Sequence, residues 1–178
     1  MQPVATFLRD FRRSEAASAT IEFALMLPLM MYLFFSTIEL GIFLTRKVML
    51  ERGIDLAVRQ VRIGAMDPVT HENLVDAICA GAGIIPDCRN QLKLEMIRRD
   101  LRSWRGFDQN ADCIDRADDE SQPPRNFEPG MQNELILLRA CSLFDPFFPT
   151  TGLGADLPRQ SEGAYAIVAM SAYVVEPR

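Results

Sequence analysis

The sequence predicts an α+β protein in which a long N-terminal helix crosses a membrane and continues into a small domain with a short antiparallel sheet. Residues 23–44 form an apolar run that contains a single charge, Glu39. As a helix of about 1.5 Å per residue, this run would span roughly 33 Å, enough to cross the hydrocarbon core of a bilayer. Farther along, residues 91–96, 134–143 and 163–175 show the alternating or aliphatic-rich patterns that are typical of strands.

The chain is expected to have three parts. Residues 1–17 are a short basic leader with three arginines, residues 18–45 are the transmembrane helix, and residues 46–178 are one α+β domain. About 130 residues are enough for a single hydrophobic core. A net charge of −5 and the lack of a basic stripe with interleaved aromatic residues argue against nucleic acid as a partner.

The membrane helix is expected to continue into the domain, because apolar residues recur at spacings of three and four from Leu50 to Ala65. Gly53 opposes this extension by about 1 kcal/mol relative to alanine, and Gly64 and Pro68 predict the helix end. Pro28 removes a backbone donor and crowds the preceding turn, which predicts a kink or a loosened turn. A membrane helix that tolerates the proline without consequence is the alternative.

The remaining elements follow from local signals. Thr70 is a candidate N-cap for a short helix that ends at Gly81 and Gly83. Residues 91–96 predict a half-buried strand, although residues 97–101 fit a helix equally well. Residues 105–130 are rich in Asp, Asn, Pro and Gly and predict a long irregular connection, and residues 145–158 predict a broad loop between the last two strands.

Small residues precede a carboxylate and an apolar run near the N-terminus, which reverses the order found in a secretory signal peptide. Residues 19–28, ATIEFALMLP, resemble the signature of TadE-like proteins, the minor pilins or pseudopilins of tight-adherence (Tad, type IVc) pili. Residues 38–41, IELG, are similar to the usual end of the apolar stretch in that family. The likeness is strong over residues 14–64 and looser at residues 129–130, 144–149 and 173–177.

The resemblance implies that a prepilin peptidase cuts between Ala17 and Ser18, which makes Glu22 the fifth residue of the mature chain. It also implies that Glu22 pairs with the new N-terminal amine of its own chain or of a neighbour. Such pairing is physically reasonable because a buried amine and a buried carboxylate offset each other's desolvation. A glutamate that only lies among the lipid headgroups is the alternative. The family usually has glycine where this chain has Ala17, which weakens the expectation of a cut.

The resemblance further implies a structural role in the assembly or initiation of a Tad pilus for adhesion. The expected partners are other Tad pilins and minor pilins, inner-membrane platform proteins, the prepilin peptidase and membrane lipid. The expected location is the bacterial inner membrane, with one pass, a cytoplasmic N-terminus and a periplasmic C-terminal domain, or the surface pilus after assembly. The alternative function is a signal-anchored periplasmic binding or sensing module, in which the helix is only a tether.

Four cysteines, Cys79, Cys88, Cys113 and Cys141, all follow the membrane segment and form no CxxC pair. An even number in one compartment favours disulfides in the periplasm over a zinc site or a catalytic thiol. A bond between Cys79 and Cys88 would close a short loop and leave Cys113 to pair with Cys141, but the other two connectivities stay open. Four reduced cysteines in the core are the alternative.

Glu39 lies near the end of the apolar run and is expected to extend toward the membrane interface, with a lateral contact to another membrane protein as the alternative. Asp108, Asn110, Asp112 and Asp119 have the spacing of EF-hand calcium ligands. However, cysteine occupies the position of the required glycine, so an acidic solvated loop is expected instead. We therefore expect no metal and no other cofactor.

Enzyme activity is not expected. His71 is the only histidine and has no nucleophile or ligand pattern near it, and the common hydrolase, metalloprotease and nucleotide-binding motifs do not occur. A membrane-anchored enzyme would need catalytic groups that converge from residues 105–130. Phe144, Phe147 and Phe148 are expected to pack within the domain, or to form a contact patch if they are exposed.

Overall fold

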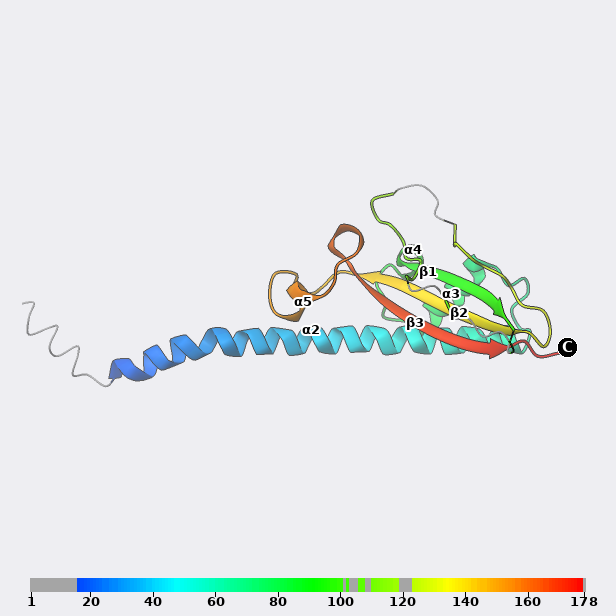
Figure 1. The fold of residues 1–178 in the computed structure, drawn as a ribbon. Helices are drawn as coiled ribbons and strands as arrows, with labels where there is room; N and C mark the ends of the chain where they lie inside the picture. The colour runs from blue at the N-terminus through cyan, green and yellow to red at the C-terminus, as the bar shows by residue number, and fades with distance from the viewer. Residues whose placement is uncertain (1–15, 101, 103–105, 108–109, 119–122, 178) are drawn as a thin grey trace, which may run out of the picture.

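The computed structural model describes residues 16–100, 102, 106–107, 110–118 and 123–177. Figure 1 shows one long helix whose C-terminal half carries a small head made of a sheet, short helices and loops. This is the α+β arrangement that the sequence predicted. The elements in chain order are α2 (Ala16–Arg62), α3 (His71–Ala82), α4 (Cys88–Gln91), β1 (Leu92–Arg99), β2 (Leu135–Phe144), α5 (Leu153–Asp156), the 3-10 turn η1 (Ser161–Gly163) and β3 (Tyr165–Val174).

Helix α2 is continuous over 47 residues and passes through Pro28. Figure 1 shows that it changes direction within its blue N-terminal part and then runs straight beneath the head. It ends at Arg62, just before Gly64, which adopts a left-handed φ of 72°. The predicted extension of the helix out of the apolar segment is therefore confirmed.

Helix α3 explains why α2 contains Gly53. A Cβ atom at position 53 would lie 2.5 Å from the carbonyl oxygen of Ile78, and Gly81 lies directly opposite. The two glycines therefore allow the backbones of α2 and α3 to approach closely, which offsets the poor helix propensity of Gly53. The predicted start of α3 is confirmed, because the Thr70 side chain accepts a hydrogen bond from the Asn73 N–H.

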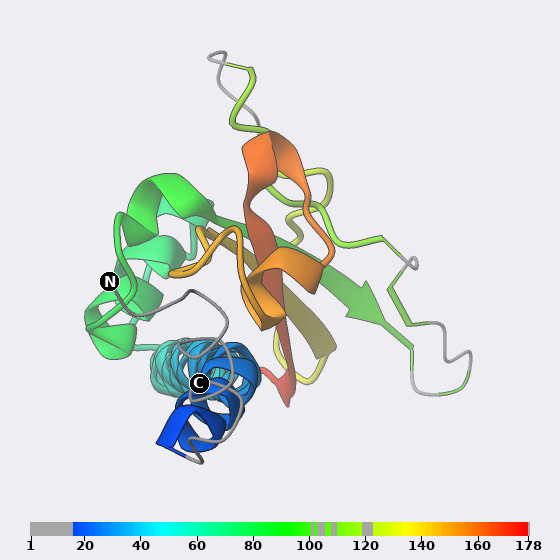
Figure 2. The same ribbon diagram turned by 90° about the vertical axis from the view of Figure 1, so that its left-hand side faces the viewer.

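The three strands form an antiparallel sheet in the order β1-β2-β3. Strand β1 continues to Arg99, so the ambiguous residues 97–99 belong to a strand. Viewed along α2, helix α3 and the sheet pack against the same half of the helix (Figure 2). One face of the sheet meets these helices in a single core, whose largest fully buried side chains include Leu50, Ile54, Leu74, Ile78, Leu94, Met96, Ile136, Leu138, Tyr165 and Ile167.

The other face of the sheet is covered unevenly. The described parts of residues 106–128 lie over β1 and β2, where Cys113 is bonded to Cys141 of β2. Residues 126–128 also bond to the free edge of β1 through both backbone groups of Met96. None of the described residues covers the outer face of β3 in this way, and Met170 is 67% exposed there.

Both disulfides form in the structure, between Cys79 and Cys88 and between Cys113 and Cys141. This is the connectivity in which the short loop closes on itself. The first bond joins α3 to α4, and the second ties the long irregular connection to the sheet.

Candidate functional site

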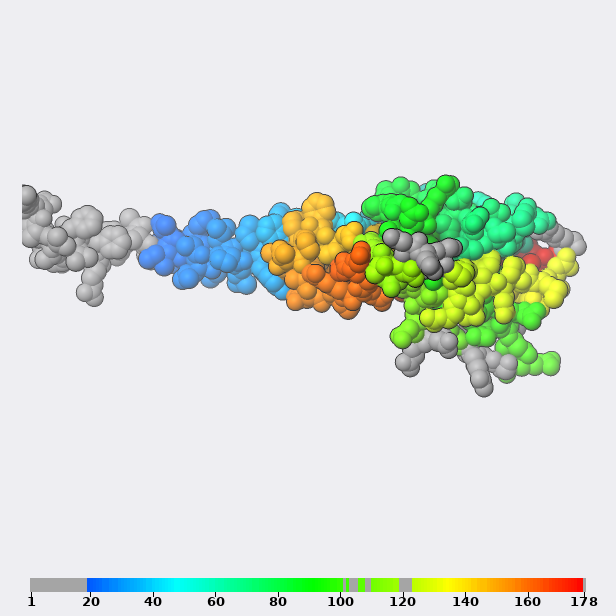
Figure 3. Space-filling model, turned by 90° about the horizontal axis from the view of Figure 1, so that it is seen from above, coloured from blue at the N-terminus to red at the C-terminus, as the bar shows by residue number. Residues whose placement is uncertain are grey.

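The N-terminal part of α2 projects beyond the head. Residues 19–34 are all exposed, and the helix contains a window apolar enough to cross a membrane. Figure 3 shows this part extending, in blue, away from the rest of the molecule. Ala17 and Ser18 lie in the first turn of α2, and Glu22 follows one turn later with an exposed side chain. Cleavage at position 17 and pairing of Glu22 with an amine stay predictions.

Glu39 is fully buried, and the expectation that it extends to the membrane interface is wrong. Its carboxylate accepts hydrogen bonds from two consecutive backbone N–H groups of the loop that follows β2. The Phe147 N–H donates to Oε2 at 2.9 Å and to Oε1 at 3.2 Å, and the Phe148 N–H donates to Oε2 at 2.9 Å. The charge is therefore satisfied within its own chain rather than by water or another protein.

The 145–157 loop contacts α2 over several turns around Glu39. The rings of Phe35 and Phe148 lie 4.7 Å apart, and the Ser36 Oγ accepts the Leu153 N–H at 3.2 Å. Gly152 is required at this contact, because it has a φ of 57° and its Cβ would lie 2.5 Å from the Ser36 Oγ. Closer to the start of the helix, the Tyr32 hydroxyl donates to Asp156 at 3.4 Å.

Arg46 lies at the C-terminal end of the contact between α2 and the loop. Its guanidinium donates to the Asp145 carbonyl at 3.0 Å and to the Tyr165 hydroxyl at 2.8 Å, and it lies over the Phe144 ring at 4.9 Å. Burial raises the pKa of Tyr165, although the neighbouring Arg46 opposes the rise, so its hydroxyl stays protonated at neutral pH. The α2 residues of this helix–loop junction lie along one face of the helix: Tyr32, Phe35, Ser36, Glu39 and Arg46.

A second polar cluster lies on the outer face of the sheet. Arg139 and Glu95 are almost completely buried and pair directly, with the Arg139 Nε 2.7 Å from the Glu95 Oε2. Beside them, the Lys93 Nζ lies 3.1 Å from the Asp112 Oδ1. These pairs link β1 and β2 to the irregular connection. Because each buried charge has an opposite charge or hydrogen-bond partner, the cluster has a structural explanation.

The structure describes only two of the four residues in the candidate calcium loop, Asn110 and Asp112. Asp108 and Asp119 lie outside the described residues. Asp112 pairs with Lys93, and the Asn110 carbonyl accepts a hydrogen bond from Arg139. Among the described residues, no three His, Cys, Asp or Glu side chains come together as a metal site would require.

His71 also has a structural role. Its Nε2 accepts a hydrogen bond from the Leu94 N–H at 3.2 Å, and its ring lies edge-on to Phe127. Burial lowers the pKa of His71, which keeps the ring neutral as this acceptor role requires.

The aromatic residues that follow β2 have different environments. Phe144 is buried in the domain, whereas Phe147 is 64% exposed.

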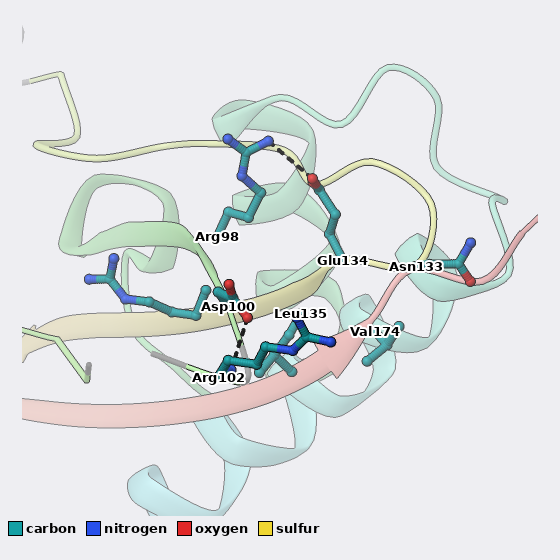
Figure 4. A pocket seen from close by; sticks show the side chains of 8 residues that line it. Arg98, Asp100, Arg102, Asn133, Glu134, Leu135 and Val174 are labelled. Carbon is teal, nitrogen blue, oxygen red and sulfur yellow. Dashed lines mark hydrogen bonds and ion pairs between the residues drawn. The ribbon is translucent and has the colours of Figure 1, made fainter. Parts of the chain in front are cut away.

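The head carries a shallow pocket of about 460 Å³ at the end of the sheet near Arg98 and Arg99 (Figure 4). Arg98 pairs with Glu134 at 3.1 Å, and Asp100 accepts the backbone N–H of Arg102. The residues that line this pocket include no nucleophile with a neighbouring base. The pocket therefore offers arginine side chains but no recognisable catalytic arrangement.

Sequence reasoning missed the partners of Glu39 and the roles of Ser36, Arg46 and Gly152. The available signal was a serine, a glutamate and an arginine on one helix face, at positions 36, 39 and 46. The partners of Glu39 and Ser36 are backbone groups of a loop more than 100 positions away, with separations of 108 for Glu39 and Phe147 and 117 for Ser36 and Leu153. Such groups leave no mark on the side-chain pattern.

The fold and the junction define a class of protein: a long helix, apolar and exposed at its start, that is joined by hydrogen bonds and ring contacts to a small disulfide-bonded head. A single apolar helix of this kind is compatible with a single-pass membrane anchor. The family model of TadE-like proteins, which belong to the Tad pilus system, matches residues 17–59, so this segment of the chain is similar to that family. TadE-like proteins are structural components of that pilus rather than a family of enzymes. Neither the curated proteins nor the solved structures include a significant match.

Proposed function

We propose that this protein is a minor pilin or pseudopilin that acts in the assembly or initiation of a Tad pilus for adhesion. The observation that carries the proposal is the TadE-like match over residues 17–59, which coincides with the part of α2 that runs from the exposed apolar segment into the core of the head. In this role the apolar segment packs among other membrane helices, and the head contacts other pilus proteins. The mechanism is structural, with no chemical step.

Processing by a prepilin peptidase between Ala17 and Ser18 is part of the proposal. The new amine at Ser18 and the carboxylate of Glu22 would lie four residues apart, and side chains at this spacing are neighbours on a helix. In an apolar environment the pair would relieve the desolvation cost of each charge. The same geometry allows Glu22 to reach the amine of an adjacent subunit, which would set the register between neighbours.

The two disulfides support a periplasmic head, because such bonds persist in oxidising compartments. In the proposed arrangement the leader lies in the cytoplasm and the helix in the inner membrane. The proposed partners are therefore other Tad pilins and minor pilins, the inner-membrane platform proteins and the prepilin peptidase.

Strand β3 is the surface of the head that fits a partner best. Its ten residues carry no charge and no proline, and within the described part of the chain its backbone bonds only to β2 along its length. Val168, Met170 and Val174 are exposed on its outer face. Long uncharged edge strands bind further strands readily, and proteins that must stay monomeric usually protect them with charges or bulges.

The direction of β3 restricts how a second copy could pair with it. Strand β3 and helix α2 both point away from the N-terminal end of the molecule (Figure 1). Two copies inserted the same way in one membrane would therefore have their β3 strands parallel, which excludes antiparallel pairing between them. A strand from another pilus subunit is free of this restriction.

Mass spectrometry of the protein extracted from membranes of cells with the peptidase tests the processing step. We expect a mature chain that starts at Ser18, and loss of this product in Ala17→Lys. An intact chain that starts at Met1 would support the tether function instead. Glu22→Lys should impair assembly, whereas Glu51→Lys, which changes an exposed glutamate on the same helix, should not.

Co-purification of other Tad pilus proteins tests the β3 surface. Met170→Lys should reduce the amount that is recovered with this chain. Met131→Lys is the matched control, since both methionines are 67% exposed and only Met170 lies on β3. Equal recovery with the two variants would reject β3 as the contact surface without affecting the processing test.

A further inference from the structure

The 145–157 loop contacts α2 next to the exposed apolar part of this helix. Its short helix α5 is the element of the head nearest to the N-terminal half of α2 (Figures 1 and 3). Asp156 contacts Tyr32, and Gly152 and Leu153 lie beside Ser36. A shallow cleft of about 490 Å³ between the loop and α2 extends as far as Pro28.

The length of α2 determines how deep this loop lies if the helix crosses a bilayer. A hydrocarbon core of about 30 Å requires roughly 20 helical residues. Counted from Ala16, where α2 begins, these residues end at Phe35, and counted from Ser18 they end at Thr37. A span that began earlier in the chain would bring the leader arginines into the hydrocarbon, at about 2.5–3.5 kcal/mol for each one near the centre. A span over residues 23–44 would instead bring the irregular loop into the hydrocarbon, where its unpaired backbone groups would lack partners. Residues 32–36, which the loop covers, thus lie at the boundary between hydrocarbon and headgroups.

The composition of the loop fits that boundary. Between Pro146 and Leu157 the only charged residue is Asp156, and its carboxylate accepts the Tyr32 hydroxyl. The exposed residues at its surface include Phe147 and the two threonines at positions 150 and 151. Aromatic and small polar side chains are well suited to the interfacial layer, where an apolar ring and a hydroxyl group both find partners.

Glu39 sets the position of the loop relative to the helix. Its carboxylate holds the backbone at Phe147 and Phe148, so the Phe147 ring is directed outward from a fixed point on α2. The loop therefore cannot withdraw from the membrane surface without breaking these hydrogen bonds. A rigid attachment of this kind favours a contact at constant depth.

We propose that the 145–157 loop enters the interfacial layer of the bilayer on the side of the head, with Phe147 in contact with lipid. The cleft beside Pro28 and Tyr32 then lies at the depth of the lipid chains, which fill it. This inference rests on the proposed membrane span of α2. Its consequence is that the height of the head above the membrane is fixed by a second contact besides the helix.

Depth-dependent fluorescence quenching tests the inference on the full chain in phosphatidylcholine vesicles with brominated acyl chains. The natural chain has one tryptophan, so a Trp104→Phe background makes each introduced tryptophan the only one. Phe147→Trp reports on the loop, and Thr150→Trp gives a second position in it. Met26→Trp reports on the exposed helix, and Met170→Trp reports on the outer face of β3.

We expect Phe147→Trp and Met26→Trp to lose most of their emission in brominated lipid, and Met170→Trp to keep it. Bromine near the headgroups should quench Phe147→Trp more than bromine near the chain ends, and the order should reverse for Met26→Trp. Quenching of Met26→Trp without quenching of either loop variant would overturn the inference while the membrane span stands. A blue-shifted but unquenched loop tryptophan would assign the contact to protein and overturn it too. If Met26→Trp is also unquenched, the span itself fails.

Discussion

Replacing Glu39 is the most direct test of the helix–loop junction. The carboxylate is fully buried and accepts hydrogen bonds from two backbone N–H groups, those of Phe147 and Phe148. Hydrogen bonds to charged groups contribute about 1.5–3 kcal/mol each. Glu39→Ala removes both acceptors, and the freed N–H groups recover part of this loss from water once the loop opens. Taking the lower value for each, we expect the junction to weaken by about 3 kcal/mol.

This loss corresponds to a roughly 150-fold larger population of the opened loop. Hydrogen exchange of peptides from residues 145–157, measured by mass spectrometry on the detergent-solubilised protein, reports this population. Glu39→Gln keeps one acceptor oxygen and should have an intermediate effect. The peptides from α3 should be unaffected, because the change concerns local opening rather than the core.

Glu51→Ala is the matched control, because Glu51 lies on the same helix with a half-exposed side chain and pairs with Lys47 only at 4.0 Å. Surface pairs of this kind contribute about 0–1 kcal/mol, so we expect exchange of the loop to be unchanged. Equal protection of the loop in Glu39→Ala and in the natural protein would refute the role assigned to the buried carboxylate. Equal losses in Glu39→Ala and Glu51→Ala would refute it as well.

Three further changes test the head, each by urea unfolding. Gly53→Ala should lower the free energy of unfolding by about 1–3 kcal/mol, because the added methyl group would lie 2.5 Å from a carbonyl oxygen of α3; a stabilised variant would contradict this packing. Burial lowers the pKa of His71 in the folded chain below 6.5, so the unfolded chain takes up the proton first as the pH falls. The free energy of unfolding should therefore fall as the pH drops from about 6.5 toward the pKa of the folded chain. His71→Gln should lose this dependence, and an unchanged pH profile would assign it to another group. Arg139→Met should lower the free energy of unfolding by about 3–5 kcal/mol, because Glu95 would stay buried without its charged partner. Adding Glu95→Leu should recover most of this loss. No recovery in the double variant would argue against the pair.

Much of the fold could be predicted because its signals are local. The apolar run and the three-and-four spacing that follows it indicate one continuous helix, and Thr70 marks the start of α3. The strands at residues 135–144 and 165–174 follow from short aliphatic stretches between turn residues. The TadE-like match likewise lies in a contiguous segment, residues 17–59, whose pattern is set by neighbouring positions.

The junction could not be predicted for the same reason. Glu39 looked like a charge near the end of a membrane helix, where a long side chain would reach water. Its partners are backbone amides of a loop without regular structure, and any residue except proline supplies such an amide. Arg139 and Glu95 are charged residues within strands, and no local pattern shows that the irregular connection covers them.

The sequence by itself therefore determined that this protein has a helix apolar enough to span a membrane and an α+β head, and it favoured disulfides in that head. Both depend on periodicity and composition along the chain, and in lipid a helix satisfies its own backbone groups without help from distant residues. Only the tertiary structure decided how the helix and the head are joined. A buried charge must find partners in three dimensions, and for Glu39 these partners come from residues that are distant in sequence but adjacent in the fold.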